Sequence, residues 1–395
     1  MERSHFRLTR VRLRHYRSIA EADVRLGSLV FLVGPNGSGK SNFVDAPRLV
    51  SDALRTSMEQ ALGERGGVAQ VRRRSPGHPA YFSVELSFEG PGFEGSYAIK
   101  VAAARQGGFR ITREQCEVVS AAGSGSGEPS RAAFRVEDGQ VAATTEPSLP
   151  AADPRSLLLA GLARRRPFRA VYEGLAGISA FNLAPQAMRA LRAPGRGHAL
   201  DREGSNVASV LHRLGRGPAA GQDDGKRLDS YLQRIVPGIQ GARRRVLGGL
   251  ETVEFAQDVP GSAHPWRFTA PSVSDGTLRS LGVLVALFAP ADGAYGVVAI
   301  EEPETALHPT ATAVLLEALR DAADRRQVLV TSHSPELLDH EDVDVAELRA
   351  VRADQGRTAI GDLDEEGAFA LRAQLDTAGA LLRGDRLLPH PSALL

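Results

Sequence analysis

Apolar and polar residues alternate at the start of the chain and then give way to a continuous apolar run. The stretch FRLTRVRLRHY (residues 6–16) alternates in part, which is typical of a strand with one buried face. The stretch EADVRLGSLVFLV (residues 21–33) ends in a wholly apolar run, which predicts a strand buried on both faces. A glycine-rich loop follows, and a helix is predicted from about Gly39, with Pro47 expected to end or kink it near Ala46.

The pattern then changes several times along the chain. Strand-like segments dominate residues 81–119, and the composition of residues 121–130, AAGSGSGEPS, is that of a flexible loop. Residues 153–236 carry helical spacing instead. The predicted helices are DPRSLLLAGLARR with an Asp cap, GSNVASVLHRLG between Ser205 and Gly215, and RLDSYLQRIVPG. Strands return at 243–270, and helices and strands alternate from Ser274 to Thr331, which predicts a parallel sheet with crossover helices.

These changes predict an α/β protein in which two halves of one fold are separated by a mainly helical insert. The expected parts are a first lobe at 1–120, the insert or lid at 121–242, a second lobe at 243–365 and a tail at 366–395. The acidic stretch DLDEE at 362–366 is expected to be a solvated loop.

Composition narrows the class of protein. The 395 residues carry a formal net charge of +1, so any basic surface must be local. Cys116 is the single cysteine, which excludes a disulfide framework and a cysteine metal site. The basic start has no apolar segment after it, and no apolar run approaches the roughly 18–20 residues that span a bilayer. We therefore expect a soluble, cytoplasmic protein.

The loop after the first buried strand has the composition of a phosphate cradle. GPNGSGKS fits the pattern G-x-x-x-x-G-K-[ST] and lies between a strand and a helix, as that motif requires. Its backbone N–H groups can wrap phosphates, Lys40 can reach the β- and γ-phosphates, and the Ser41 hydroxyl can hold Mg²⁺. The predicted nucleotide contacts are Gly34, Pro35, Asn36, Gly37, Ser38, Gly39, Lys40, Ser41 and Asn42.

Two later strands end in polar side chains. The apolar run 297–300 is followed at once by Glu301 and Glu302, and in a parallel nucleotide-binding sheet this end lies beside the phosphates. Glu301 is expected to hold Mg²⁺, and Glu302 to act on the attacking water as general base or polariser. The strand QVLVTS ends before His333, which is placed to sense a γ-phosphate. A histidine near a loop with no other motif around it more often has a structural role than a functional one.

Together these segments resemble the ABC-type ATPase heads of the RecF/SMC/OLD group. More narrowly, the chain is similar to small bacterial AAA-family (AAA15-like) ATPases that lack a TOPRIM domain. The segments RLRHYRSIAEADVRLGSLVFLVGPNGSGKSNFVDA, LDREGSNVASVLHRL, SVSDGTLRSLGVLVAL, AIEEPETALHP and VTSHSPELL occur in the order that group shows. The resemblance implies a fold of this type: a mixed or parallel sheet with flanking helices, plus an antiparallel β lobe.

The resemblance also assigns roles that the residues alone do not. It makes Glu301 and Glu302 the Walker B pair, and His333 the switch histidine. It implies a signature motif at Ser274, Asp275, Gly276 and Thr277, and a D-loop at Thr305, Ala306, Leu307 and His308. Arg17 matches a basic residue that touches nucleotide in some relatives. The Q-loop departs from the pattern, since Arg74 stands at the expected place and Gln70 four residues earlier.

The resemblance predicts how such a chain works. ATP on the phosphate loop of one subunit would be capped by the signature of another, in a C₂ dimer with Mg²⁺ that acts as an ATP-driven switch. We expect a role in DNA-linked or anti-phage defence processes with a separately encoded effector, such as a nuclease or TOPRIM-like protein. Arginine runs at 72–74, 164–166 and 243–245 leave nucleic acid open as a partner, although solvated faces also carry such runs. A subunit energising a membrane transporter and a non-hydrolysing scaffold are the alternatives.

Overall fold

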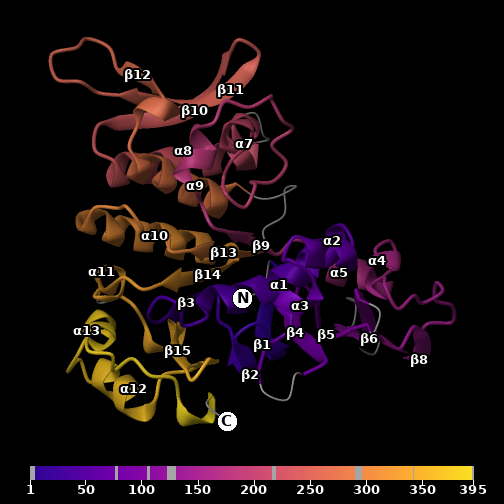
Figure 1. The fold of residues 1–395 in the computed structure, drawn as a ribbon. Coiled ribbons are helices and arrows are strands. Elements are labelled where there is room, and N and C mark those ends of the chain that lie inside the picture. The colour runs from indigo at the N-terminus through magenta and orange to yellow at the C-terminus, as the bar shows by residue number, and fades with distance from the viewer. Residues whose placement is uncertain are drawn as a thin grey trace.

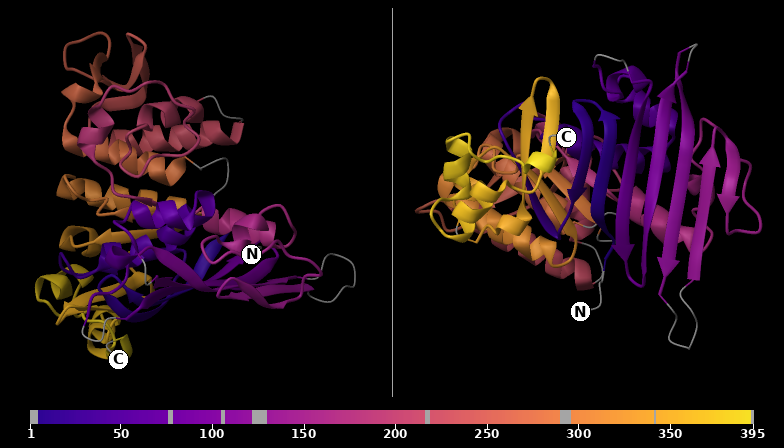
Figure 2. Two further views of the ribbon diagram at one scale, coloured as in Figure 1. Left: turned by 45° about the vertical axis from the view of Figure 1, so that its right-hand side comes forward. Right: turned by 90° about the horizontal axis from the view of Figure 1, so that it is seen from below.

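A computed structural model describes residues 5–75, 79–104, 107–121, 130–215, 219–289, 296–340 and 342–393. Within these ranges the strands form three sheets (Figure 1). A parallel sheet lies at the centre of the molecule, a large antiparallel sheet lies beside it, and a small three-stranded sheet lies at the opposite end from the C-terminal helices (Figure 2).

The central sheet has six strands in the order β16-β15-β3-β14-β13-β9. Their bounds are β3 Leu29–Val33, β9 Ser179–Phe181, β13 Val297–Glu301, β14 Gln327–Ser332, β15 Leu348–Asp354 and β16 Arg357–Gly361. All neighbours pair in parallel except β15 and β16, which are antiparallel. The carboxyl ends of β3, β13 and β14 therefore meet at one edge of the sheet.

Strand β3 explains why the sequence there is continuously apolar. Val30 and Leu32 contribute to one core, which also contains buried residues of the antiparallel sheet. Leu29, Phe31 and Val33 contribute to a second core, on the other face of the parallel sheet. Because side chains alternate along a strand, both faces of β3 must be apolar.

Helices cover both faces of the parallel sheet. Helix α1 (Lys40–Arg55) packs against β9, β1 and β4, and so lies between the parallel and antiparallel sheets. Helices α9 (Asp275–Phe288) and α10 (Thr312–Ala323) pack on the opposite face, against β13 and β14. The signature motif and the phosphate loop therefore belong to helices on opposite faces of one sheet.

The antiparallel sheet has seven strands in the order β2-β1-β4-β5-β6-β7-β8. Their bounds are β1 Arg7–Tyr16, β2 Ile19–Arg25, β4 Tyr81–Gly90, β5 Phe93–Ala103, β6 Phe109–Ser120, β7 Ser130–Glu137 and β8 Gln140–Thr144. The small sheet consists of β10 Ile239–Leu247, β11 Leu250–Gln257 and β12 Trp266–Thr269. It packs on α7 (Val207–Leu214) and α8 (Ala219–Ile235).

Short helices connect these parts. They are α2 Met58–Gly63, α3 Val68–Val71, α4 Leu158–Gly161, α5 Phe168–Ala176, α6 Pro185–Arg189, α11 Pro335–Leu338, α12 Glu365–Arg372 and α13 Ala378–Arg383. Single 3₁₀ turns lie at Ala270–Ser272, Pro309–Ala311, Val345–Glu347 and Pro391–Ala393. Within the described ranges, no helix is long and apolar enough to cross a membrane.

Several local predictions are confirmed, and three are wrong. Helix α1 continues through Pro47 to Arg55, because buried neighbours hold the helix although proline removes one backbone hydrogen bond. Asp153 does not begin a helix: the backbone N–H of Ile111 bonds to the carbonyl of Pro154, which holds this segment against β6. The acidic stretch at 362–366 is not all loop, since Asp364 caps α12 through the backbone N–H of Gly367.

The insert expected at 121–242 does not form a separate helical unit. Strands β7 and β8 extend the antiparallel sheet, and β9 is an edge strand of the parallel sheet. The boundary expected at 242 falls inside β10, and the expected tail contains α12 and α13. Strand β9 pairs with β13, which is remote in sequence, so local periodicity does not assign it. Strands β7 and β8 instead continue the antiparallel sheet from β6.

Candidate functional site

The loop Gly34–Ser41 leaves the carboxyl end of β3 and begins α1. Gly39 has φ +107°, and a Cβ atom there would lie 2.3 Å from Thr358 Oγ1 on β16. At Gly34 a Cβ atom would lie 1.9 Å from the carbonyl oxygen of Val351 on β15. Glycine is therefore required at Gly39 by its backbone conformation and by close packing against β16, and at Gly34 by close packing against β15.

Lys40 is folded back into this loop. Its Nζ donates to the carbonyl oxygens of Gly34 at 2.7 Å and Pro35 at 2.9 Å. Burial lowers the pKa of Lys40, and the negative charges of Glu302 and Glu304 oppose that shift. Ser38 Oγ is buried and has no hydrogen-bond partner among the described residues. A phosphate seated in the loop would supply an acceptor for such an orphaned hydroxyl and for the ammonium group, so these residues fit a nucleotide.

Glu301 ends β13 and lies beside the loop. Ser41 Oγ donates to Glu301 Oε2, and the Glu301 side chain is only 10% exposed. Within the described ranges, no group of three or more His, Cys, Asp or Glu side chains could hold a metal. A hydroxyl and one carboxylate nonetheless suit Mg²⁺, which keeps waters and takes phosphate oxygens as its remaining ligands.

Glu302 and His333 lie together at the next strand ends. The backbone N–H of Glu302 bonds to the carbonyl of Thr331 at 2.9 Å, and Glu302 adopts φ +47°. Its Oε1 lies 3.0 Å from His333 Nδ1, and both side chains are half-exposed. The two residues predicted to act on water and to sense phosphate are thus adjacent on neighbouring strands.

Glu304 is a site residue that sequence reasoning missed. Ser332 Oγ donates to its Oε1 at 2.6 Å, and its Oε2 is buried without a hydrogen-bond partner among the described residues. Burial raises the pKa of Glu304. The third carboxylate of the EEPE segment was visible in the sequence, but its position beneath the site depends on the pairing of β13 with β14.

Arg279 was also missed, and it connects the signature helix to the acidic strand end. Its Nη2 donates to the carbonyl oxygens of Glu301 at 3.1 Å and Glu302 at 3.0 Å, and its Nη1 to that of Leu183 at 2.8 Å. Helix α9 carries Arg279 in its second turn. Arg279 therefore links α9 to the backbone of both glutamates.

The signature begins α9 on the surface. Ser274 caps the helix by accepting from the backbone N–H of Thr277 at 3.2 Å, and Arg189 on α6 pairs with Asp275. At Gly276 a Cβ atom would lie 2.4 Å from the carbonyl oxygen of Ala306. Ser274 and Asp275 are exposed, as are Thr305, Ala306 and His308 of the D-loop, whereas Leu307 is half-buried.

No hydrogen bond or ion pair joins the signature to the phosphate loop in the part of the chain that the structure describes. The described partners of Ser274–Thr277 lie in α6 and in α9 itself, and Gly276 packs closely against the D-loop. The structure thus brings the loop, Glu301, Glu302 and His333 together, and leaves the signature and D-loop on an exposed surface of the same chain.

The remaining predicted residues lie beside the loop. Arg17 Nη2 pairs with Asp45 Oδ2 at 2.8 Å, on the second turn of α1, and Asn42 Nδ2 donates to Ser18 Oγ at 2.7 Å. Gln70 and Arg74, the two Q-loop candidates, are both exposed. Their positions favour neither candidate over the other.

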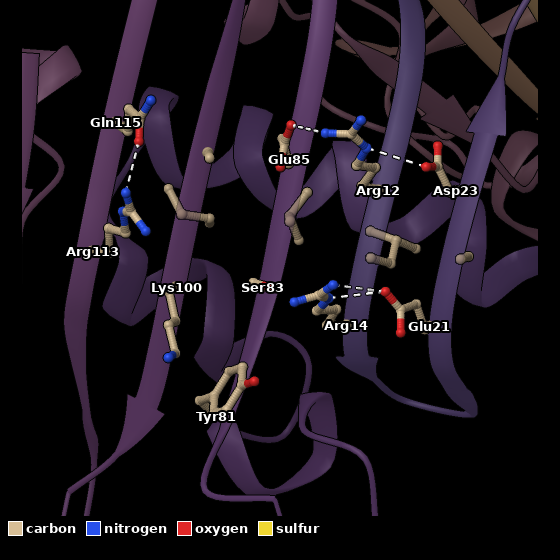
Figure 3. Close-up of a pocket in the computed structure, with 15 residues that line it drawn as sticks. Arg12, Arg14, Glu21, Asp23, Tyr81, Ser83, Glu85, Lys100, Arg113 and Gln115 are labelled. Atoms are coloured by element: carbon tan, nitrogen blue, oxygen red, sulfur yellow. Dashed lines mark hydrogen bonds and ion pairs between the residues drawn. The ribbon is translucent and has the colours of Figure 1, made fainter. Parts of the chain in front are cut away.

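The outer face of the antiparallel sheet is hollowed but carries a different arrangement (Figure 3). Arg12 pairs with Asp23 at 3.2 Å and Glu85 at 2.7 Å, and Arg14 pairs with Glu21 at 2.9 Å. These side chains neutralise one another across neighbouring strands. The hollow therefore presents a ladder of ion pairs rather than a catalytic cluster.

A glycine-rich phosphate loop and an acidic strand end at the carboxyl edge of one parallel sheet are the features of a P-loop fold of the ABC/SMC-head type. The chain belongs to the family described as "AAA domain, putative AbiEii toxin, Type IV TA system", whose profile matches residues 129–339. No curated protein matches the sequence.

Solved structures agree on the fold. The chain is similar to an SmcHead crystallised with the C-winged helix domain of ScpA, with TM-score 0.56, 14% identity and coverage of 92% of this chain and 99% of that one. It is also similar to an Smc head domain with an extended coiled coil bound to the C-terminal domain of ScpA, derived from Pyrococcus furiosus. That match has TM-score 0.53 and 12% identity, and covers 94% of this chain and 99% of that one.

Proposed function

We propose that the chain hydrolyses ATP with Mg²⁺ and works as a head-to-head dimer that nucleotide closes. Two separate exposed segments support the proposal. The phosphate loop contacts the acids of its own chain through the bond between Ser41 and Glu301, with Glu302 and His333 beside it, and the signature lies on another surface, where Asp275 pairs with Arg189. A C₂ dimer pairs each loop with the signature of the partner, which gives two composite sites.

Each residue has a role in this scheme. The loop and Lys40 bind the phosphates, and Asn42 and Arg17 border them. Ser41 and Glu301 would hold Mg²⁺, which neutralises charge on the β- and γ-phosphates. Glu302 accepts the proton of the attacking water, and His333 orients Glu302 and reports the γ-phosphate.

Hydrolysis would then change the conformation of the dimer. The partner's Ser274 and Gly276 cap the γ-phosphate, with the D-loop beside them, so cleavage removes a group that both subunits hold. Arg279 carries any resulting movement of α9 to the acidic strand end. Phosphate release from ATP, measured with Mg²⁺ and with EDTA, tests the activity, and Lys40→Ala should abolish it. Equal release by the Lys40→Ala protein would contradict the assignment.

We further propose that this switch serves a DNA-linked or anti-phage process with a separately encoded effector. Strand alternation turns two arginines of the run 243–245 outward, where Arg243 and Arg245 join Arg267 around the single carboxylate of Glu254. Arg244 points to the other face and pairs with Glu251 at 2.8 Å. This leaves an excess of positive charge on the outer face of β10–β12, which supports contact with a nucleic-acid backbone.

Binding of a DNA duplex and of single-stranded RNA tests the nucleic-acid contact. Charge reversal of Arg243, Arg245 and Arg267 together should weaken binding at all sequences and flatten its dependence on salt. ATP turnover should rise in the presence of DNA, RNA or the product of an adjacent nuclease-like gene. Turnover that none of these stimulates would contradict the DNA-linked and effector proposals.

A further inference from the structure

The segment Asp201–Asn206, DREGSN, forms a turn that the predicted function leaves without a role. The backbone N–H of Gly204 bonds to the carbonyl of Asp201 at 2.9 Å. Ser205 Oγ donates to Asp201 Oδ2 at 2.6 Å, and Asn206 Oδ1 accepts from the backbone N–H of Asp201 at 2.8 Å. Asp201, Gly204, Ser205 and Asn206 thus form the hydrogen bonds that hold the turn. The side chain of Arg202 takes no part in these bonds.

The turn is attached to the edge of the parallel sheet. The backbone N–H of Asn182 bonds to the carbonyl of Arg202 at 3.0 Å, and that of Ala184 to the carbonyl of Glu203 at 3.1 Å. Residues 182–184 directly follow β9, which pairs with β13. Two successive backbone bonds therefore fix Arg202 beside the strand that ends in Glu301.

Arg202 reaches the metal-binding carboxylate of the nucleotide site. Its Nη2 lies 3.2 Å from Glu301 Oε1, while Ser41 Oγ engages Glu301 Oε2. The Arg202 side chain is 43% exposed, so a ligand can reach it from solvent, whereas Glu301 is nearly buried. The guanidinium carries five N–H donors, and this contact uses one of its nitrogens.

We propose that Arg202 is a phosphate ligand of the bound nucleotide, held on Glu301 in the free protein and exchanged from it to the phosphates on binding. The inference rests on the nucleotide site proposed above. A triphosphate on Lys40 and Ser41 places several negative charges beside an exposed guanidinium, and arginine binds phosphate oxygens through two parallel hydrogen bonds. The exchange releases a carboxylate oxygen of Glu301 at the moment when phosphate oxygens arrive, which couples nucleotide binding to the metal site.

Titration calorimetry with ATP in EDTA tests the exchange without relying on catalysis. Four proteins form a cycle: the unaltered chain, Arg202→Ala, Glu301→Gln and the double variant. Arg202→Ala should weaken ATP binding about tenfold, the loss expected for a charge-assisted contact. Glu301→Gln should strengthen ATP binding because it frees Arg202, and the double variant should show no such gain.

Controls separate this inference from the function beneath it. Arg196→Ala removes an exposed arginine from the same connection and should bind ATP as the unaltered chain does. Thermal unfolding of each variant verifies that it is folded. If Arg202→Ala leaves ATP affinity unchanged, or Glu301→Gln strengthens binding equally with and without Arg202, Arg202 only neutralises Glu301 and the inference is overturned. If the unaltered chain fails to bind ATP both in EDTA and with Mg²⁺, the nucleotide site itself is wrong.

Discussion

Helices α1 and α9 both begin at glycine-containing segments that were predicted to contact phosphate, and their surroundings differ. Helix α1 starts beneath the phosphate loop, where Ser41 contacts Glu301 and Lys40 closes on the loop carbonyls. Helix α9 starts at the signature, where Ser274 caps the helix and Asp275 is tied to Arg189. Both helix starts suit an anion, and among the described residues Lys40 and the strand end Glu301–Glu302 lie beside the first.

This difference between the two helix starts indicates which part of the proposed nucleotide site each helix provides. In the proposed dimer, the start of α1 holds the phosphates and lies beside the acids of its own chain. The start of α9 is exposed and is held by Arg189 of α6, and in that dimer it would cap the nucleotide of the partner. Three experiments test these assignments of the two helix starts, and a fourth tests the stability of the fold.

The largest effect is expected at the acids beside α1. Glu302→Gln keeps the shape of the side chain but removes its basicity, so turnover should fall by about 10²–10⁴-fold while ATP binding is kept. Glu336→Gln, at an exposed carboxylate three residues after His333, is the matched control. Steady-state turnover and ATP affinity measure both. A Glu302→Gln protein that retained most of its turnover would remove Glu302 from the reaction.

Complementation tests whether the start of α9 acts on the partner's nucleotide. Lys40→Ala and Ser274→Tyr should each abolish turnover, and the Ser274→Tyr monomer should still bind ATP. An equal mixture should recover about a quarter of the normal turnover, because half of the dimers are mixed and each has one complete site. An inactive mixture of proteins that do form mixed dimers would show that the signature serves its own chain.

Arg279 tests the connection between the two helix starts. Arg279→Lys keeps the charge but loses the planar fork that holds three carbonyl oxygens. The strand end that carries Glu302 should then be less well positioned, and turnover should fall about tenfold with little change in ATP affinity. Arg234→Lys, at a surface pair with Glu317, is the control. Unchanged turnover in Arg279→Lys would mean that the arginine is not needed to position Glu302.

Glu114 on β6 should affect stability rather than the site. Burial raises the pKa of Glu114 to about 7, against hydrogen bonds from the backbone N–H groups of Leu159 and Leu158 and the hydroxyl of Tyr97. The folded chain therefore keeps this proton at pH values where the unfolded chain has released it. The free energy of unfolding should fall as pH rises from about 4.5 through about 7.

Denaturant unfolding across that pH range measures the effect. Glu114→Gln should lose this part of the slope, and Glu117→Gln on the same strand should keep it. Equal slopes in all three proteins would show that Glu114 is ionised in the folded chain.

The sequence predicts what local chemistry determines. The phosphate loop, the acids after β13 and the histidine after β14 were predicted because each directly follows an apolar strand, and parallel strands bring such ends together. The outcome at Pro47 differs because packing outweighs a local helix breaker. The sequence pattern around Pro47 does not show how much of α1 is buried against the rest of the protein.

The missed residues depend on contacts between distant segments. Arg202 reaches Glu301 only because β9 pairs with β13, and Thr358 meets Gly39 only because β16 lies beside β15 at the sheet edge. Arg279 lies in a correctly predicted helix, but its partners are backbone carbonyls, which no side-chain pattern reveals. Strands β7 and β8 were assigned to the insert because composition does not show that β7 pairs with β6 and β8 with β7.

We predict that ATP joins two copies of this chain through α1 of one and α9 of the other. Light scattering after size-exclusion chromatography of the Glu302→Gln protein tests it most directly. With ATP and Mg²⁺ the mass should double, and with ADP it should return to that of one chain. A Glu302→Gln protein that binds ATP to saturation, stays at the mass of one chain and continues to hydrolyse would contradict the account.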